Sequence, residues 1–276
     1  PDIPIEAIGD EPFQMAHKFP DIYVAVDRDR CHGIEQLTDG KTTPGVEAVL
    51  LDDAFQHRYV KAGLNILLVD YHRPIQQDKL LPAGRLRESS SGRKRADILI
   101  VSKCPPHLDA ENCQQFRKEL KPLPHQSLYF TTLAYGKLRP LFTEEPERAL
   151  ETLTPEEHLL VVTGIASPAP LLEELSRHTR HVHPLTFGDH HNFTETDLHR
   201  IEETFLRIPG PQKSIVTTEK DAARLIAHPK LSEKLKPYFH VLPIEVRFLN
   251  NEEESFNQQI IAYVRKNSRN SCLSEG

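Results

Sequence analysis

The stretch Val49-Leu50-Leu51-Asp52-Asp53-Ala54-Phe55-Gln56-His57 joins an apolar run to two adjacent carboxylates. Such a run predicts a buried strand that delivers its acidic side chains to the edge of a sheet. A Walker B element places an aspartate beside the magnesium of a bound nucleotide in this way. The phosphate-binding partner of that element, Gly-x-x-x-x-Gly-Lys-Ser/Thr, occurs nowhere in the 276 residues. The stretch therefore indicates either other chemistry or a chain that lacks its front end.

Length and composition fit a soluble globular protein with one large or two modest domains. Hydrophobic residues make up 38% of the chain and charged residues 27%. The net charge of −6 gives no basic field, so we expect no nucleic-acid partner. The four cysteines form no Cys-x-x-Cys pair, which favours a reducing compartment and no structural zinc. No signal peptide and no apolar run of membrane-spanning length occur, so the cytoplasm is the expected compartment.

Short apolar runs alternate with helical stretches along the chain, which predicts an α/β architecture with a mostly parallel sheet. Strands are expected at residues 22–26, 48–51, 65–70, 97–101, 158–163, 213–217 and 239–248. Helices are expected at residues 30–38, 110–120, 170–178, 221–227 and 256–265. The pattern changes at residues 127–142, which predict a β-ribbon joining two domains.

The expected domains are a core with the Walker B element at residues 1–125 and a two-stranded linker at 126–150. A smaller α/β domain at 151–266 and a disordered tail at 267–276 follow. The chain begins with Pro1, and a dense motif starts by about its tenth residue. Chain termini are normally frayed and without function. We therefore interpret the sequence as a fragment or a mis-started chain.

Two acidic motifs are candidates for chemistry. Gly9-Asp10-Glu11-Pro12 offers a carboxylate pair, although an ordinary turn with a helix cap has the same pattern. Asp52 and Asp53 are the sharper candidates, because adjacent acids after an apolar run need a cation or solvent at the sheet edge. Gln56 and His57 add polar groups at the same edge, where open α/β sheets bind ligands.

A basic stretch follows the sequence Leu81-Pro82-Ala83-Gly84. Five of the eleven residues from Arg85 to Arg95 are arginine or lysine. Arginines on a Gly/Ser-rich loop suit phosphate, because the guanidinium binds oxyanions through two hydrogen bonds. A solvated loop without a ligand explains the same composition equally well.

The segment Gly188-Asp189-His190-His191 is a second acid–base candidate, since a neighbouring aspartate can orient a histidine. His181 and His183 lie just upstream, so a metal cluster is an alternative. Thr218-Glu219-Lys220-Asp221 fits a capping box, with Thr218 as N-cap. By itself this motif indicates a structural role rather than a functional one.

With these motifs the chain resembles the tetraacyldisaccharide 4′-kinase (lipid A 4′-kinase) family. Five signatures occur in the order of that family, and together they span roughly residues 8–222. They are Gly9-Asp10-Glu11-Pro12, Asp52-Asp53-Ala54-Phe55-Gln56-His57, Leu81-Pro82-Ala83-Gly84 with Leu86-Arg87-Glu88, Asp189-His190, and Thr218-Glu219-Lys220-Asp221. Each signature is weak to moderate by itself, whereas the ordered set is specific.

The resemblance implies an α/β fold with a P-loop NTPase-like core and a smaller C-terminal α/β domain joined by a β-ribbon. It also implies that ATP, with Mg²⁺, phosphorylates the 4′-hydroxyl of tetraacyldisaccharide 1-phosphate, a lipid A disaccharide precursor. The enzyme would act as a monomer at the cytoplasmic face of the bacterial inner membrane, in peripheral contact with the bilayer.

The resemblance further implies roles for individual residues. Asp52 would bind magnesium, Asp53 would support the same site, and Asp10 would take the proton from the sugar hydroxyl. His190, brought by the second domain, would assist Asp10. The nucleotide contacts implied are Gln56, His57, Arg87 and Glu88, and the substrate contacts are Arg30 and Arg85.

The sequence departs from the family pattern at Ala54, Arg85 and Ser89, where glycine or proline is frequent; these changes look tolerable. The absence of the P-loop is more serious, because its backbone and lysine are the main ligands of the β- and γ-phosphates. We therefore expect residues 1–276 alone to be inactive as a kinase.

Two other functions remain open from the residues. A metal-dependent phosphoesterase of the DHH type could use Asp189-His190-His191 together with Asp52 and Asp53, but its further early aspartate motifs are not found. A non-catalytic module could bind an anionic glycolipid on the loop from Arg85 to Arg95.

Overall fold

The computed structural model describes the backbone of residues 5–189, 191–226 and 228–271, and their side chains apart from residues 5, 6, 10 and 268–271. Its contacts divide the chain into two compact units. The first unit comprises the residues up to Val26 together with Tyr135–Glu245, and the second comprises Asp27–Ala134 together with the residues from Val246 onward. Within the described residues, no helix combines the length and apolarity needed to cross a bilayer.

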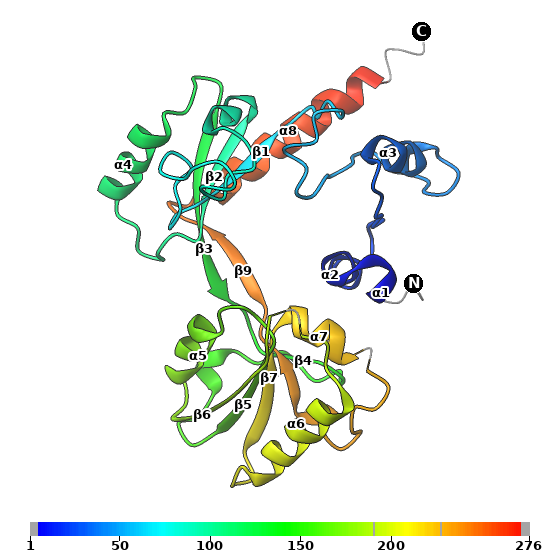
Figure 1. Ribbon diagram of the computed structural model, residues 1–276, viewed down its shortest axis with the longest axis vertical. Helices are drawn as coiled ribbons and strands as arrows, with labels where there is room; N and C mark the ends of the chain where they lie inside the picture. Colours follow the sequence, from blue (N-terminus) through cyan, green and yellow to red (C-terminus); the bar gives the residue numbers. More distant parts are fainter. Residues whose placement is uncertain (1–4, 190, 227, 272–276) are drawn as a thin grey trace. The chain divides into compact units, whose positions relative to one another are not determined.

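The second unit contains a four-stranded sheet in the order β1-β2-β3-β9 (Figure 1). Its strands are β1 (Ile66–Asp70), β2 (Ile98–Ser102), β3 (Ser127–Tyr135) and β9 (Ile244–Phe248). Strands β1, β2 and β3 are parallel, which requires crossover connections between them. The other elements of this unit are α3 (Arg30–Thr38), the short 3₁₀ helix η1 (Ser90–Arg95), α4 (Ala110–Leu120) and α8 (Glu253–Ser271).

Two helices cover the faces of this sheet. Strand β2 is buried from Ile98 to Val101, as expected for a central parallel strand. Phe116 and Leu120 of α4 pack on one face, and Phe256 and Ile260 of α8 pack on the other. Asp109 caps α4 by accepting the backbone N–H of Asn112 at 2.7 Å.

The first unit contains a five-stranded sheet in the order β4-β8-β7-β5-β6, in which only β4 is antiparallel to its neighbour. Its strands are β4 (Arg139–Pro140), β5 (His158–Thr163), β6 (His181–Thr186), β7 (Lys213–Thr217) and β8 (Phe239–Val241). Its helices are α1 (Ile5–Ile8), α2 (Asp10–Lys18), α5 (Ala169–Ser176), α6 (Glu195–Arg207) and α7 (Glu219–Ile226), with the 3₁₀ turns η2 (Leu150–Thr152) and η3 (Lys236–Tyr238).

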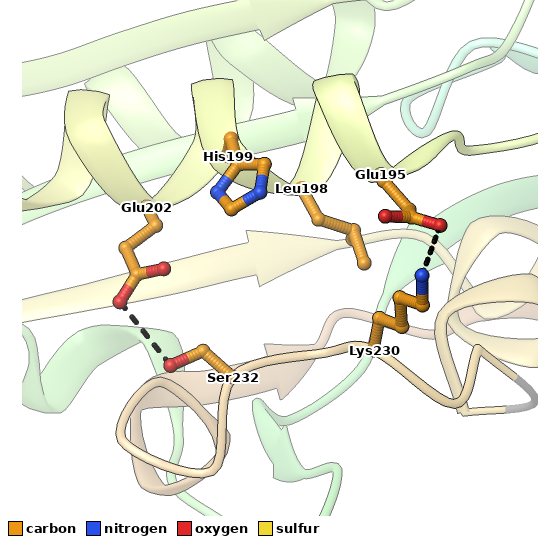
Figure 2. A pocket seen from close by; sticks show the side chains of 6 residues that line it. All are labelled: Glu195, Leu198, His199, Glu202, Lys230 and Ser232. Carbon is orange, nitrogen blue, oxygen red and sulfur yellow. Dashed lines mark hydrogen bonds and ion pairs between the residues drawn. The ribbon is translucent and has the colours of Figure 1, made fainter.

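A groove of about 250 Å³ lies between α6 and the loop before η3 (Figure 2). Its acidic groups already have partners within the protein: Glu195 pairs with Lys230, and Glu202 accepts a hydrogen bond from Ser232 at 3.2 Å. The groove is therefore bridged by the protein's own polar contacts.

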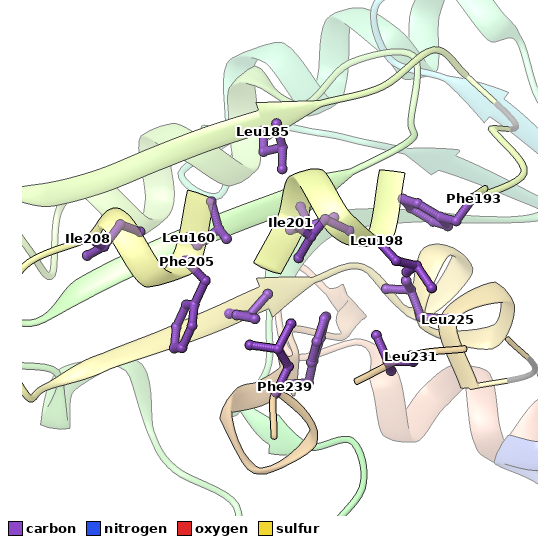
Figure 3. Close-up of a cluster of buried hydrophobic side chains, with 13 residues drawn as sticks. Leu160, Leu185, Phe193, Leu198, Ile201, Phe205, Ile208, Leu225, Leu231 and Phe239 are labelled. Atoms are coloured by element: carbon purple, nitrogen blue, oxygen red, sulfur yellow. The ribbon is translucent and has the colours of Figure 1, made fainter. Parts of the chain in front are cut away.

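Alternate residues of β5 supply the two hydrophobic cores of this unit. Leu160 and Val162 face the core formed with α6 and α7, which includes Phe205 and Phe239 (Figure 3). Leu159 and Val161 face the other core, which α5 completes. A strand buried on both faces needs the continuous apolar run that the sequence shows.

Two predicted strands, at residues 22–26 and 48–51, do not form. Both segments are irregular, and Leu50 is 91% exposed. The described sheet ends at β1, where Leu68 is 63% exposed, and neither segment pairs with that edge. A strand needs a neighbour to take its hydrogen bonds, so an apolar run without one does not become a strand.

The predicted ribbon and last strand also differ from the structure. Residues 138–142 were expected to return along β3, but Arg139 and Pro140 pair with β8 instead, and β9 lies beside β3. The run from Phe239 to Phe248 forms two strands, β8 and β9, in different sheets. Pro243 separates them, because proline has no N–H to give to a ladder.

Candidate functional site

The turn after the apolar run displays Asp52 and Asp53 to solvent. Asp53 has a φ of +45°, in the left-handed region that aspartate tolerates better than most residues. Its carboxylate accepts a hydrogen bond from Arg87 Nη1 at 2.7 Å. The structure therefore brings two of the predicted site residues together across 34 positions of sequence.

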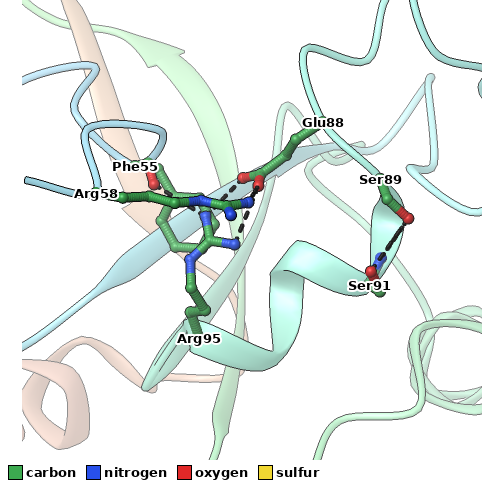
Figure 4. Close-up of polar contacts among 6 residues, drawn as sticks. All are labelled: Phe55, Arg58, Glu88, Ser89, Ser91 and Arg95. Carbon is green, nitrogen blue, oxygen red and sulfur yellow. Dashed lines mark hydrogen bonds and ion pairs between the residues drawn. The ribbon is translucent and has the colours of Figure 1, made fainter.

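Glu88 and Arg95 tie this turn to the basic stretch (Figure 4). Arg95 donates to both carboxylate oxygens of Glu88, at 2.7 and 3.0 Å. It also donates to the backbone oxygen of Phe55 at 3.0 Å, and its guanidinium lies 4.7 Å from the centre of the Phe55 ring. Arg58 adds a hydrogen bond to Glu88 at 3.0 Å. Arg95 thus holds the segment that carries Asp52 to His57.

The charges of this cluster are fixed near neutral pH. Hydrogen bonds from Arg95 and then Arg58 hold the pKa of Glu88 below its ordinary value, against the opposing effect of burial. The hydrogen bond and charge of Asp53 raise the pKa of Arg87. The cluster therefore offers permanent charges to a polar ligand rather than a proton donor.

The remaining predicted contacts of this unit lie around the cluster with different partners. Gln56 and His57 are exposed in the turn beyond Asp53. Arg30 is the first residue of α3 and donates to the backbone oxygen of Asp27. Arg85 is exposed, and its backbone N–H donates to Asp78 at 3.2 Å. The structure gives neither arginine a contact with Asp53, Arg87 or Glu88.

The basic stretch is partly used by the fold itself. Arg93 donates to the backbone oxygen of Leu120 at 2.9 Å, at the end of α4. With Arg95 bound to Glu88, two of the five cations hold neighbouring segments rather than face solvent. The exposed side chains of Arg85, Arg87 and Lys94 remain as the cationic surface of this stretch.

Replacing Arg95 by alanine should destabilise the second unit by about 1.5–3 kcal/mol, because hydrogen bonds to a half-buried carboxylate and to the Phe55 carbonyl are lost. Replacing Arg58 is the matched control: its side chain is 69% exposed, and its single ion pair should contribute at most about 0.5 kcal/mol. Denaturant unfolding followed by amide signals of β1 and β2 measures both losses. Equal losses would show that Arg95 has no special role in holding the turn.

The acid–base candidates of the first unit are partly described. Asp10 begins α2 after Gly9, which has a φ of +88°; the side chain of Asp10 and the whole of His190 lie outside the described residues. The neighbour His191 takes Asp197 as its carboxylate partner, at 2.9 Å. Asp189 instead lies 3.8 Å from the Lys220 ammonium. The expected pairing of Asp189 with His190 lies outside the described residues.

Hydrogen bonds shape the residues after this loop. Burial alone would raise the pKa of Asp197, but hydrogen bonds from Thr194 and His191 outweigh it and hold that pKa below its ordinary value. Thr194 and Asp197 also form a capping box that starts α6. The carboxylate that orients His191 is thus fixed by the start of a helix.

The upstream histidines stack on one another. The rings of His158 and His181 are nearly parallel with centres 4.2 Å apart, and His158 Nδ1 lies 3.0 Å from His183 Nε2. Burial lowers the pKa of His183, so it is neutral near pH 7. Across the part of the chain that the structure describes, no three His, Cys, Asp or Glu side chains are arranged to hold a metal ion. The suggested metal cluster at His181 and His183 is not seen.

Sequence reasoning assigned no individual role to several residues of this region. Arg58, Phe55 and Arg95 act through contacts that only the folded chain brings together. Asp221 and Arg224 are buried where the loops of the first unit meet, although the Thr218–Asp221 motif had indicated only a helix cap. The sequence did contain part of this information. Arg224 follows the capping residue Asp221 by three positions, and such a spacing places two side chains on the same face of a helix.

Comparisons with known proteins show which family this chain belongs to. The family model described as tetraacyldisaccharide-1-P 4′-kinase matches residues 1–265. A tetraacyldisaccharide 4′-kinase of Phocaeicola vulgatus is 55% identical over 274 residues, which cover 99% of this chain and 75% of the relative. One of Bacteroides fragilis (strain YCH46) is 55% identical over 272 residues, covering 98% of this chain and 72% of the relative.

A solved structure has the same fold. It is LpxK from Aquifex aeolicus in complex with ATP, and the TM-score is 0.66 at 23% identity. The match covers 95% of this chain and 71% of that one. The prediction of a mixed α/β fold with parallel sheets is confirmed, and the fold is that of the Aquifex structure. The family model and the relatives together establish that this chain belongs to the tetraacyldisaccharide-1-P 4′-kinase family.

Proposed function

We propose that this chain carries the catalytic residues of an ATP-dependent kinase that phosphorylates the 4′-hydroxyl of tetraacyldisaccharide 1-phosphate. The observation that carries the proposal is the pairing of Asp53 with Arg87 beside the exposed Asp52, in a chain of this family. Phosphoryl transfer depends mainly on positioning and on charge neutralisation, which fixed side-chain charges supply.

The donor set fits magnesium and a nucleotide. Magnesium in kinase sites takes one or two carboxylates, together with substrate phosphates and water. The exposed Asp52 carboxylate would be that ligand, while Asp53 is held by Arg87 and shapes the turn. Bound magnesium would neutralise charge on the phosphates. The exposed side chains of Gln56, His57 and Arg87 would contact the nucleotide, and Glu88 would orient Arg95 and Arg58 around them.

Asp10 and His190 would handle the proton of the sugar hydroxyl. Asp10 would accept that proton as the hydroxyl attacks, and His190 would orient or assist Asp10. Arg30 and Arg85 would contact the phosphate of the disaccharide, since guanidinium groups bind oxyanions well. The protein would act as a monomer in peripheral contact with the cytoplasmic face of the inner membrane, where a lipid substrate is accessible.

A hybrid enzyme tests this proposal. These 276 residues would replace the matching part of the P. vulgatus relative, whose remaining quarter stays in place. The hybrid should transfer labelled γ-phosphate from ATP to the 4′-hydroxyl of the lipid. The isolated polypeptide of residues 1–276 should show no transfer, because it contains no Gly-x-x-x-x-Gly-Lys-Ser/Thr sequence to bind the phosphates.

The unmodified relative is the positive control for the assay. A folded hybrid that binds the lipid without phosphorylating it would contradict the kinase proposal and favour a glycolipid-binding module. Transfer by the isolated polypeptide would show that the motif is not needed.

A further inference from the structure

The helix α7 begins with the last part of the Thr218-Glu219-Lys220-Asp221 motif, and its residues contact three neighbouring segments. Asp221 is fully buried and accepts the backbone N–H of Gly164 at 3.0 Å, just after β5. It also accepts the Thr218 hydroxyl at 2.7 Å, which completes the local cap. A buried carboxylate is tolerated only with such partners. The motif therefore does more than cap the start of a helix.

Arg224 connects Asp221 to the loop after β6. It is 8% exposed, and its Nη1 donates to the backbone oxygen of His191 at 3.0 Å. The same atom lies 3.7 Å from Asp221 Oδ1. A buried arginine that holds a main-chain oxygen fixes the loop whatever side chain that residue carries.

Further contacts hold the same loop on both sides of residue 190. On one side, Asp189 lies 3.8 Å from Lys220, the residue before Asp221. On the other side, His191 stacks on the Phe187 ring with centres 4.8 Å apart and binds Asp197. The residues that flank position 190 are thus each tied to α7, by Lys220 and by Arg224.

The packing around these contacts leaves little room. A Cβ added to Gly164 would lie 3.0 Å from Asp221 Oδ1 and 3.2 Å from the Cβ of His191. The loop after β5, the loop after β6 and α7 therefore meet within van der Waals contact. Such a junction transmits a change in one segment to the others.

Helix α7 also holds α2, the helix that Asp10 begins. The carboxylate of Glu219 accepts the Lys18 ammonium at 3.0 Å, and both residues belong to the first unit. One short helix thus contacts the helix of the proposed base and the loop of the proposed assisting histidine.

We infer that Arg224 and Lys220 are positioning residues that fix Asp189 and His191, the described neighbours of position 190, to α7 and so relative to α2. The inference rests on the proposed function for the roles of Asp10 and His190. Arg224 acts through the backbone oxygen of His191, and Lys220 acts through the side chain of Asp189.

Amide hydrogen exchange in the 276-residue chain tests the inference without any activity. In Arg224→Lys and Arg224→Gln, the amides of residues 189–193 should exchange about tenfold faster or more, since a hydrogen bond from a charged group is lost or weakened. Lys220→Ala should accelerate exchange on the Asp189 side. Arg207→Gln is the matched control, because Arg207 is an exposed arginine of the same unit that pairs with Glu203 at 3.2 Å.

Exchange of the β5 and β7 amides in the same spectra shows whether the fold is intact. Should the Arg224 variants unfold, Lys220→Ala carries the test, because its side chain lies at the surface of the junction. Unchanged exchange at residues 189–193 in the folded variants would overturn the inference.

A second measurement separates this inference from the proposed function. The signal of the His190 imidazole is identified as the one that disappears in His190→Gln. Its pKa is then measured in the parent chain and in Asp10→Asn. The substitution should lower the pKa of His190 in the parent chain, because a nearby negative charge is removed, and should have less than half that effect in Arg224→Lys. A loosened loop with no effect of Asp10→Asn in the parent would leave the positioning roles standing and contradict the Asp10–His190 pairing.

Discussion

The hybrid kinase carrying Asp10→Asn is expected to lose about 10²- to 10⁴-fold in kcat, the usual contribution of a positioned general base. Asparagine keeps the size and polarity of the side chain but cannot take the proton of the sugar hydroxyl. Because the base acts in the transition state, the KM for the lipid should change little. Steady-state kinetics with labelled ATP measures both constants.

Asp21→Asn is the matched control for that substitution. Asp21 lies just after α2 in the same unit, and its side chain is exposed. Its loss should leave kcat within about threefold of the parent, as expected for a surface change of less than about 0.5 kcal/mol. If the two variants behave alike, Asp10 is not the base and the proposed proton transfer needs another acceptor.

The second large effect concerns stability. Arg148 donates to both carboxylate oxygens of Glu157, each at 2.7 Å, and Glu157 is almost completely buried. Glu157→Ala should destabilise the first unit by about 2–4 kcal/mol, because it leaves a half-buried guanidinium without its partner. This expected loss of stability is smaller than the loss on breaking a fully buried ion pair, since Arg148 retains contact with solvent.

The neighbouring Glu156 provides the comparison. Its side chain is exposed and pairs with Arg180 at 3.4 Å, so Glu156→Ala should cost at most about 0.5 kcal/mol. Denaturant titration followed by amide signals of β5 separates the first unit from the second. Similar losses for the two variants would mean that the Arg148–Glu157 pair contributes no more than a surface ion pair.

Elements with local signals were predicted well from the sequence. The helices at residues 30–38 and 110–120 and the strands at 158–163 and 213–217 match α3, α4, β5 and β7. Asp109 before α4, and Pro122 and Pro124 after it, mark the boundaries through capping and through the missing N–H. In these cases the information lies within the segment itself.

Features that depend on distant partners were not predictable in the same way. Residues 22–26 and 48–51 have strand-like composition, but pairing with a neighbour decides whether a strand forms. The motifs named both Asp53 and Arg87 as site residues, and the structure joins them by a hydrogen bond. The hydrogen bond from Arg95 to the Phe55 backbone oxygen could be seen only in the folded chain. The burial of Arg224 could not be read from its charge, because arginine is usually exposed and is buried here only with Asp221 and the His191 carbonyl.

The second unit is built from two lengths of chain that lie on either side of Tyr135–Glu245, the longer part of the first unit. Strand β9 and helix α8 supply one edge of its sheet and the cover of one face, through Phe248 and Phe256. On a ribosome these parts emerge only after the whole of the first unit has been made. The first unit, whose last residue is Glu245, can therefore fold first, while one face of β1, β2 and β3 is still uncovered. In the cell, that interval is when the nascent chain most needs protection by chaperones.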